Sequence, residues 1–242
     1  MHTKAIKHYI ETHSYEGIRL KAVFFDMDGV LFNSMPYHAE AWHQVMKQYG
    51  MNLSREEAYM HEGRTGASTI NIVSLRDRGY EATPEEIEEI YAEKSRLFNQ
   101  NPPAAPMAGA WELLQQVKDD GLQRVVVTGS GQLSLLERLN SHFPDMFVRE
   151  LMVTAFDVKY GKPNPEPYLM ALRKAGLLPN EAVVVENAPL GIQAAKAAGL
   201  FTIAVNTGPL PTEVLVNAGA DMVYPSMDSL ASGWKEFSSL LL

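Results

Sequence analysis

The chain has 242 residues, of which 46% are hydrophobic, and this is enough to bury the core of one large domain or of one domain with an insertion. Its 21 lysine and arginine residues stand against 29 acidic residues, and the resulting net charge of −8 argues against general binding of nucleic acid. Because the chain has no cysteine, a disulfide, a thiolate zinc site and a cysteine nucleophile are excluded.

The N-terminal segment, residues 1–19, carries charged side chains and no apolar run long enough for a signal peptide. No later stretch is long and apolar enough to span a bilayer, so we expect a cytoplasmic protein that does not act at a membrane. Its histidines His2, His8 and His13 have no metal spacing, and we expect a solvated extension or a short helix. Nothing in the sequence specifies an oligomeric state.

Beyond this segment, short apolar runs alternate with helical patterns, which is typical of repeated βαβ units and a mostly parallel sheet. The expected strands are residues 21–25, 124–128, 151–154, 182–185, 202–205 and 221–223. The expected helices between them include residues 109–120, 133–140, 165–175 and 191–198. The pattern predicts a Rossmann-like α/β core formed by residues 20–33 and 105–242.

The long gap between the first two strands has helical periodicity, many charges and no convincing strand. We interpret residues 34–104 as a helical domain inserted after the first strand. The proline-rich residues 101–106 end the insertion, because prolines cannot continue a helix and favour an extended connector.

Two carboxylates follow the first strand. Asp26 and Asp28 stand two residues apart after an apolar run, where open α/β sheets bind their ligands. Such close like charges repel each other, and a divalent cation such as Mg²⁺ relieves the repulsion. From the spacing alone, an acidic turn after a strand is an equally good interpretation.

Further polar groups stand at three places. Thr128, Gly129 and Ser130 follow the second strand, Lys162 stands in a rigid proline-rich turn, and Glu186 and Asn187 end a later strand. Hydroxyls and backbone amides that precede a helix could hold a phosphate. A lysine held rigidly by neighbouring prolines is unusual if its only role is solubility. Each feature alone is also compatible with an ordinary loop.

In combination, these strand ends resemble the haloacid dehalogenase superfamily of phosphotransferases, and within it the β-phosphoglucomutase-like group. The match covers nearly all of the chain after Leu20. Four motifs occur in order: residues 26–30 with the sequence DMDGV, Thr128, the lysine of residues 161–167 with the sequence GKPNPEP, and residues 186–187 with the sequence EN.

The resemblance implies a role for each core residue. Asp26 would be the nucleophile that forms an aspartyl-phosphate, and Asp28 would be the general acid and base. Thr128 and Lys162 would hold the non-bridging oxygens of the transferred phosphoryl group.

The resemblance also implies a Mg²⁺ cofactor, whose predicted ligands are Asp26, Asp28, Glu186 and Asn187. Relatives often carry aspartate at the position of Asn187, which here supplies only a neutral oxygen. Which of Glu186 and Asn187 contacts the ion therefore stays open.

The inserted segment would form a cap over the site and select the substrate. The predicted substrate-binding residues are His38, Glu62, Arg64, Lys94, Gly129 and Ser130. In relatives the histidine at the position of His38 is thought to help couple the general acid to cap closure. As an alternative, His38 could pack against neighbouring aromatic rings. The two cap cations could equally be surface charges.

The leading hypothesis is a Mg²⁺-dependent phosphohydrolase for a small phosphorylated metabolite, either inorganic pyrophosphate or a sugar phosphate. The cap arginine that mutases use for the distal phosphate falls at Gly66, with Arg64 displaced by two residues. An unpaired carboxylate at Glu62 would repel an anionic sugar phosphate, and its combination with Glu186 and Asn187 resembles a branch that hydrolyses pyrophosphate.

The main rival is a β-phosphoglucomutase that interconverts glucose 1-phosphate and glucose 6-phosphate, which a requirement for a sugar bisphosphate would reveal. Dehalogenation is disfavoured because it would leave Asp28 and Glu186 without a role. A non-catalytic binding protein on the same fold is the remaining alternative.

Overall fold

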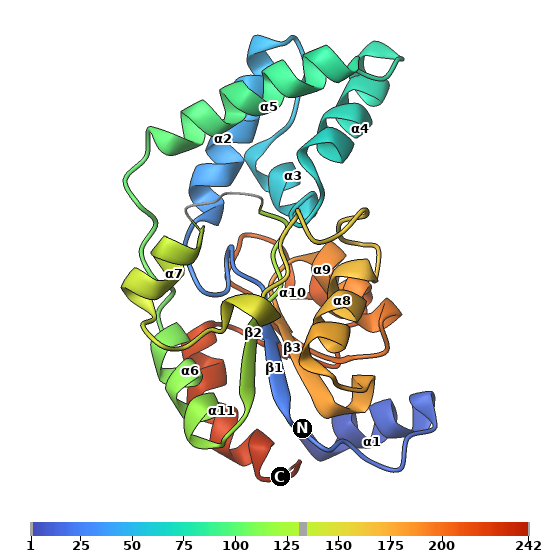
Figure 1. Cartoon of the computed structure of the whole chain (residues 1–242). Helices are drawn as coiled ribbons and strands as arrows, with labels where there is room; N and C mark the ends of the chain where they lie inside the picture. The colour runs from blue at the N-terminus through green and yellow to red at the C-terminus, as the bar shows by residue number, and fades with distance from the viewer. Residues whose placement is uncertain (1, 131–134, 242) are drawn as a thin grey trace.

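A parallel sheet forms the centre of the computed structural model, which describes residues 2–130 and 135–241 (Figure 1). Its strands are β1 (Ala22–Phe25), β2 (Gln123–Val126), β3 (Ala182–Glu186), β4 (Phe201–Val205) and β5 (Met222–Tyr224). They pair in the order β2-β1-β3-β4-β5, and every pair is parallel, which confirms the predicted fold class. The chain pairs its next two strands on opposite sides of β1, so the carboxyl end of β1 is a topological switch point, where such sheets bind ligands.

One predicted strand is wrong. Instead of a strand at residues 151–154, the chain forms the 3₁₀ turn η1 (Arg149–Leu151) and a single bridge between Val127 and Val153. The Asp157 carboxylate accepts hydrogen bonds from the Thr154 backbone N–H and hydroxyl, both at 2.8 Å. These local bonds give the backbone an alternative to a strand ladder.

Helices cover both faces of the sheet, and α1 (His2–His13) lies at the lower end of the molecule in Figure 1. The other helices of the core are α6 (Ala110–Asp119), α7 (Leu135–His142), α8 (Glu166–Ala175), α9 (Pro189–Ala197), α10 (Thr212–Asn217) and α11 (Met227–Ser238), with a short 3₁₀ turn η2 (Pro179–Glu181). The helix predicted over residues 133–140 corresponds to α7, although residues 133–134 lie outside the described part of the chain.

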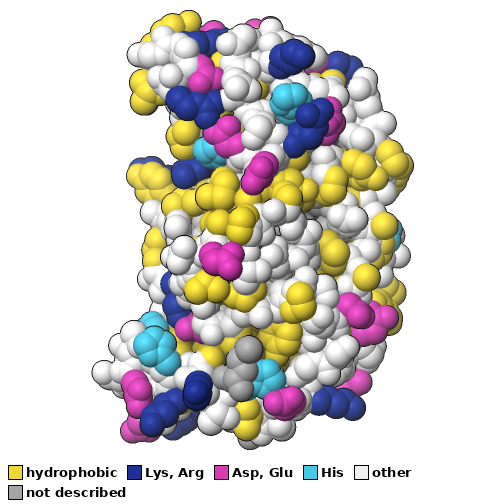
Figure 2. All heavy atoms as spheres, turned by 180° about the vertical axis from the view of Figure 1, so that it is seen from behind, with side chains coloured by type: hydrophobic (Ala, Val, Ile, Leu, Met, Phe, Trp, Pro, Cys, Tyr) yellow, Lys and Arg dark blue, Asp and Glu magenta, His cyan; other side chains and the backbone are white. Residues whose placement is uncertain are grey.

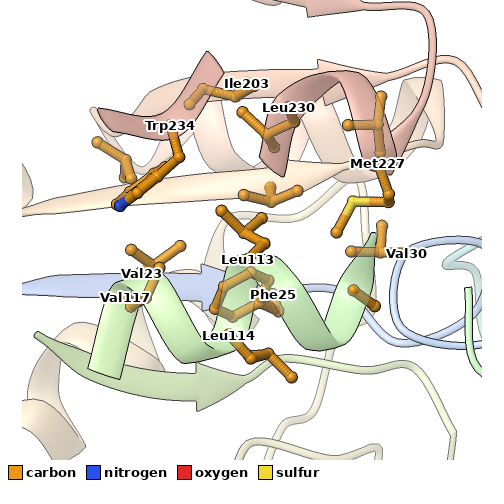
Figure 3. Close-up of a cluster of buried hydrophobic side chains, with 14 of the residues drawn as sticks. Val23, Phe25, Val30, Leu113, Leu114, Val117, Ile203, Met227, Leu230 and Trp234 are labelled. Atoms are coloured by element: carbon orange, nitrogen blue, oxygen red, sulfur yellow. The ribbon is translucent and has the colours of Figure 1, made fainter. Parts of the chain in front are cut away.

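The side chains of β1 alternate between two hydrophobic clusters. Val23 and Phe25 pack on the side of α6 and α11 (Figure 3), and Ala22 and Phe24 pack on the side of α8 and α9. All four residues are buried, as expected for a strand in a parallel sheet that is covered on both faces. This burial holds the carboxyl end of β1 in a rigid position.

The N-terminal segment is part of the core. Helix α1 buries Ile6 and Tyr9 in the main hydrophobic cluster, and the Tyr9 hydroxyl donates a 2.6 Å hydrogen bond to the Gly199 carbonyl. The expectation of a solvated extension is therefore wrong, and the alternative of a short helix is right.

A separate group of helices lies beyond the carboxyl ends of the strands (Figure 1). It consists of α2 (Met35–Gln48), α3 (Arg55–Met60), α4 (Gly66–Arg78) and α5 (Pro84–Asn99), within the segment predicted as the cap, and it has its own hydrophobic cluster. The side chains of Ser54, Thr65 and Thr83 cap the last three of these helices. Two connecting segments join the cap to the core.

The surface mixes charges of both signs. Figure 2 shows the back of the molecule, where Lys and Arg side chains lie among Asp and Glu side chains at both ends. Within the described residues, no helix has the length and apolar character needed to cross a membrane.

Candidate active site

A cavity of about 90 Å³ lies between the carboxyl ends of the strands and the cap. The predicted site residues that line it are Asp26, Asp28, His38, Glu62, Arg64, Lys94, Thr128, Gly129 and Ser130. Of the remaining predicted residues, Lys162 and Asn187 contact members of this group directly, and Glu186 contacts Lys162. The structure therefore brings residues from all four motifs and from the cap together.

Asp26 and Lys162 form a buried ion pair at the end of β1. The Lys162 Nζ atom donates hydrogen bonds to Asp26 Oδ1 at 2.5 Å, to Glu186 Oε1 at 2.6 Å and to the Val127 carbonyl at 3.1 Å. Burial raises the pKa of Asp26, and Glu186 and Asp28 raise it further, whereas Lys162 opposes the shift. Among the described residues no donor reaches Asp26 Oδ2, which leaves this oxygen for another partner.

Glu186 is fully enclosed by hydrogen-bond donors. Its Oε1 atom accepts from Lys162 and, at 2.8 Å, from the Tyr168 hydroxyl. Its Oε2 atom accepts from the backbone N–H groups of Asn187 and Ala188 at 3.0 and 3.2 Å. Because four bonds saturate the two oxygens, this carboxylate is suited to holding Lys162 rather than to binding a metal.

Asp28 lies at the start of a chain of polar contacts that leads into the cap. Its Oδ1 atom accepts a 2.5 Å hydrogen bond from the Ser34 hydroxyl and lies 3.4 Å from His38 Nε2. Burial raises the pKa of Asp28, but His38, Ser34 and Arg138 lower it more, and the net effect is a pKa below the ordinary value. The Asp28 carboxylate is therefore ionised, although the lowered pKa makes it a weaker base than an ordinary aspartate.

The series of polar contacts continues from His38 to Lys94. The Lys94 Nζ atom lies 2.8 Å from His38 Nδ1 and sits over the rings of Trp42 and Phe98, at 5.3 and 5.2 Å from their centroids. His38 stacks on Phe98, whose ring centroid is 4.1 Å away. Burial lowers the pKa of Lys94 to about 8. Both residues reach the cavity, but they also bind each other.

Residues Thr128, Gly129 and Ser130 form the loop after β2. The Thr128 hydroxyl accepts a hydrogen bond from the Ser130 backbone N–H at 3.0 Å, which fixes the shape of the loop. All three residues line the cavity, so their polar groups are placed to contact an anion held at Asp26.

The cap also reaches the core through Glu62. The Asn187 Nδ2 atom donates hydrogen bonds to both carboxylate oxygens of Glu62, at 3.2 and 3.0 Å. Burial raises the pKa of Glu62 well above its ordinary value, and Asp26, Glu186 and Asp28 raise it further. An aspartate at position 187 would place a carboxylate against Glu62, which explains why an amide stands here.

The oxygen atoms of Asp26 and Asn187 fit the coordination of a magnesium ion. Lys162 binds Asp26 through Oδ1, which leaves the other carboxylate oxygen of Asp26 available. Asn187 Oδ1 is buried and has no hydrogen-bond partner among the described residues. No cluster of three or more His, Cys, Asp or Glu side chains forms a metal cage within those residues. Mg²⁺ does not need one, since it is usually held by one or two carboxylates together with water and phosphate oxygens. Asn187 therefore fits the ion better than Glu186.

Several residues of the site were missed by sequence reasoning. Ser34 binds Asp28, Tyr168 binds Glu186, and Trp42 and Tyr91 line the cavity. Only Tyr168 had a usable signal, because it directly follows the proline-rich motif of Lys162. The others lie on helix faces or at a helix start, where nothing in the pattern separates cavity from core.

Comparison with known proteins places this arrangement among enzymes. The family described as "haloacid dehalogenase-like hydrolase" matches residues 20–199. Hexitol phosphatase A of Escherichia coli strain K12 is 33% identical, with 88% of this chain and 94% of that protein covered. Beta-phosphoglucomutase of Bacillus subtilis strain 168 is 26% identical, with 90% and 97% covered. A solved structure named "Putative beta-phosphoglucomutase from Bacteroides vulgatus" has 63% identity and a TM-score of 0.96, and it covers 98% of this chain and 97% of that one.

Proposed function

This chain belongs to the haloacid dehalogenase-like hydrolase family as an enzyme of its phosphatase and phosphomutase group, and on that premise we propose that it is a Mg²⁺-dependent hydrolase of inorganic pyrophosphate. The observation that carries the choice of substrate is the contact between Glu62 of the cap and Asn187 of the core. An ionised Glu62 beside the nucleophile is unfavourable next to a phosphate ester that arrives alone, because burial and the neighbouring carboxylates already raise the pKa of Glu62. It is tolerated by a substrate that is bound together with divalent cations.

The size of the cavity supports a small substrate. The cavity of about 90 Å³ is well below the 300–1,000 Å³ that is typical for drug-sized ligands. The cap approaches closely at Gly63, whose φ of +86° suits glycine, and an added Cβ atom there would lie 2.9 Å from Lys162 Cδ. A hexose phosphate would require the cap to stand farther from the core.

The first chemical step would be attack on phosphorus by Asp26. A carboxylate oxygen of Asp26 forms the new P–O bond, and the bond between phosphorus and the bridging oxygen breaks. The leaving phosphate takes a proton from Asp28, which must first take that proton up from solvent because its pKa is lowered. Lys162 offsets the negative charge that spreads over the non-bridging oxygens, and Thr128 and Ser130 provide donors for them.

The second step would hydrolyse the aspartyl-phosphate. Asp28 accepts a proton from a water molecule, whose oxygen attacks phosphorus and restores the Asp26 carboxylate. Its hydrogen bond from Ser34 and its contact with His38 hold it in place for both steps. A bound Mg²⁺, held by Asp26 and Asn187, would supply positive charge beside the transferred phosphoryl group.

A sugar phosphate is the second candidate substrate. Trp42 and Tyr91 line the cavity, and aromatic faces of this kind can pack against the apolar face of a sugar. With such a substrate the enzyme would be a sugar-phosphate phosphatase, or a β-phosphoglucomutase if it returned the phosphoryl group to the sugar.

Phosphate release with Mg²⁺ from pyrophosphate, β-glucose 1-phosphate, glucose 6-phosphate and other sugar phosphates tests the proposal. The Asp26→Asn variant is the blank, and a chelator should abolish turnover by the wild-type protein. We expect rapid cleavage of pyrophosphate and slow cleavage of the esters. Conversion of glucose 1-phosphate to glucose 6-phosphate that depends on a sugar bisphosphate, with little release of phosphate, would instead identify a mutase.

A further inference from the structure

Tyr168 lies behind the site, in the first turn of α8, and its side chain is fully buried. Its hydroxyl donates the 2.8 Å hydrogen bond to Glu186 Oε1, and its ring centroid lies 5.3 Å from Lys162 Nζ. Tyr168 does not line the cavity, so it touches neither the substrate nor the reacting atoms. Any effect on the reaction must pass through Glu186 or Lys162.

Glu186 is held too tightly to adjust its position. Two backbone N–H groups bind its Oε2 atom, and α9 passes so close that a Cβ atom added to Gly191 would lie 1.8 Å from Oε1. The Oε1 atom is therefore fixed, and it is shared by exactly two donors among the described residues, Lys162 and Tyr168. The position of the lysine depends on how strongly this oxygen attracts it.

Lys162 is placed between two carboxylates. Its Nζ atom lies 2.5 Å from Asp26 Oδ1 and 2.6 Å from Glu186 Oε1, so small changes decide which oxygen it favours. The Tyr168 hydroxyl occupies part of the acceptor capacity of Glu186 and stabilises its negative charge. Without this hydroxyl, Glu186 would attract the ammonium group more strongly and draw it away from the nucleophile.

We propose that Tyr168 is a positioning residue whose hydroxyl, through Glu186, keeps the ammonium group of Lys162 at Asp26. The role rests on the proposed phosphoryl transfer at Asp26, but not on pyrophosphate as the substrate. Because Lys162 acts on charge that develops in the transition state, the hydroxyl should affect kcat more than KM.

The Tyr168→Phe variant removes only the hydroxyl and keeps the ring beside Lys162. We expect kcat to fall about tenfold while KM changes by less than about twofold. Tyr9→Phe is the matched control, since Tyr9 is also buried, donates its hydroxyl to a carbonyl and has Lys196 Nζ 5.1 Å from its ring centroid. It lies at the opposite end of the sheet, so we expect a similar fall in Tm and an unchanged kcat.

A double-mutant cycle separates positioning from structural weakening. In the Lys162→Ala background, Tyr168→Phe should change kcat by less than about twofold, because the group it positions is gone. Wild-type kcat in Tyr168→Phe, or the same loss of kcat with and without Lys162, would overturn the proposal. Failure of the proposed function would look different, since the wild-type protein itself would then release no phosphate above the Asp26→Asn blank.

Discussion

The polar groups at the strand ends of the core and those that the cap contributes to the cavity are held very differently. In the core, Lys162 has three acceptors and Glu186 has four donors, all within 3.2 Å. Among the described residues of the site, Glu62 of the cap is bound only by Asn187, and the side chain of Arg64 has no hydrogen bond or ion pair. Burial also lowers the pKa of Arg64, as expected for a cation without a nearby carboxylate.

This difference separates the chemistry from the choice of substrate. Groups that stabilise a transition state act best when they are fixed before the substrate arrives, and the core groups meet this condition. Groups that recognise a substrate must keep free donors or acceptors, and Glu62 and Arg64 meet that condition, whereas His38 and Lys94 already bind each other. Changes in the core should therefore affect every substrate, whereas changes in the cap should affect some substrates more than others.

The largest effect should come from Lys162→Ala. Loss of the ammonium group removes charge from the transition state, so we expect kcat to fall by about a hundredfold or more on every substrate. Asp26 and Glu186 would then be buried without their cation, so we also expect the free energy of unfolding to fall by about 3–5 kcal/mol. Steady-state kinetics and urea unfolding measure the two effects. Activity within a factor of a few of the wild type would contradict the role of Lys162.

Glu62→Ala should have a smaller and more selective effect. We expect kcat/KM for pyrophosphate to fall about 10–100-fold, while slow cleavage of sugar phosphates changes much less or improves. The physical reason is that Asn187 loses the partner that orients its amide, and the site loses an acidic group whose ionised form is favoured only beside divalent cations. Comparing the two substrates in one preparation provides the control, because misfolding would lower both rates together.

The core could be anticipated from sequence because its site follows from strand order. Asp26, Thr128 and Glu186 each stand at or directly after a β-strand, and the carboxyl ends of parallel strands meet at one edge. A strand buried on both faces is also easily recognised from a continuous apolar run. The false strand at residues 151–154 has the same apolar character, and the side chains of Asp157 and Lys174 bind its backbone instead of a neighbouring strand.

The cap offered no comparable rule. Its cavity residues Trp42 and Tyr91 lie on helices where an aromatic residue equally predicts packing. The partner of Glu62 is 125 residues away in the sequence, and no local pattern relates the two positions. The helix over residues 2–13 was ambiguous for a similar reason, since its burial depends on contacts with Phe201 and Phe237 at the far end of the chain.

Lys94→Met should make the cap more stable and the enzyme less active. Burial lowers the pKa of Lys94 from 10.5 to about 8 although Asp28 opposes the shift, and its neighbour His38 also has a lowered pKa through burial and through Lys94 itself. The unfolded chain therefore binds the proton more tightly, and wild-type stability rises with pH between about 8 and 10.5. At pH 7 we expect the variant to gain about 3 kcal/mol in unfolding free energy.

Urea unfolding at several pH values measures this gain, which should be full below pH 8, shrink up to pH 10.5 and then vanish. Lys47→Met is the matched control, because Lys47 is an exposed residue of α2 in the same cap and should leave stability unchanged. A gain that is equal for both variants, or independent of pH, would show that the buried ammonium group is not its source.

The smallest effect is expected on the outer surface of the cap, at the ion pair of Arg55 with Glu40. Arg55 Nη2 donates to Glu40 Oε1 at 3.1 Å, and its side chain is 58% exposed. Because exposed ion pairs are screened by water and salt, Arg55→Ala should change the unfolding free energy by less than about 0.5 kcal/mol, and less still at high salt. Turnover of every substrate should stay at the wild-type value. A selective change in one substrate would mean that recognition extends beyond the cavity, and the division between a fixed core and a selective inner face of the cap would have to be redrawn.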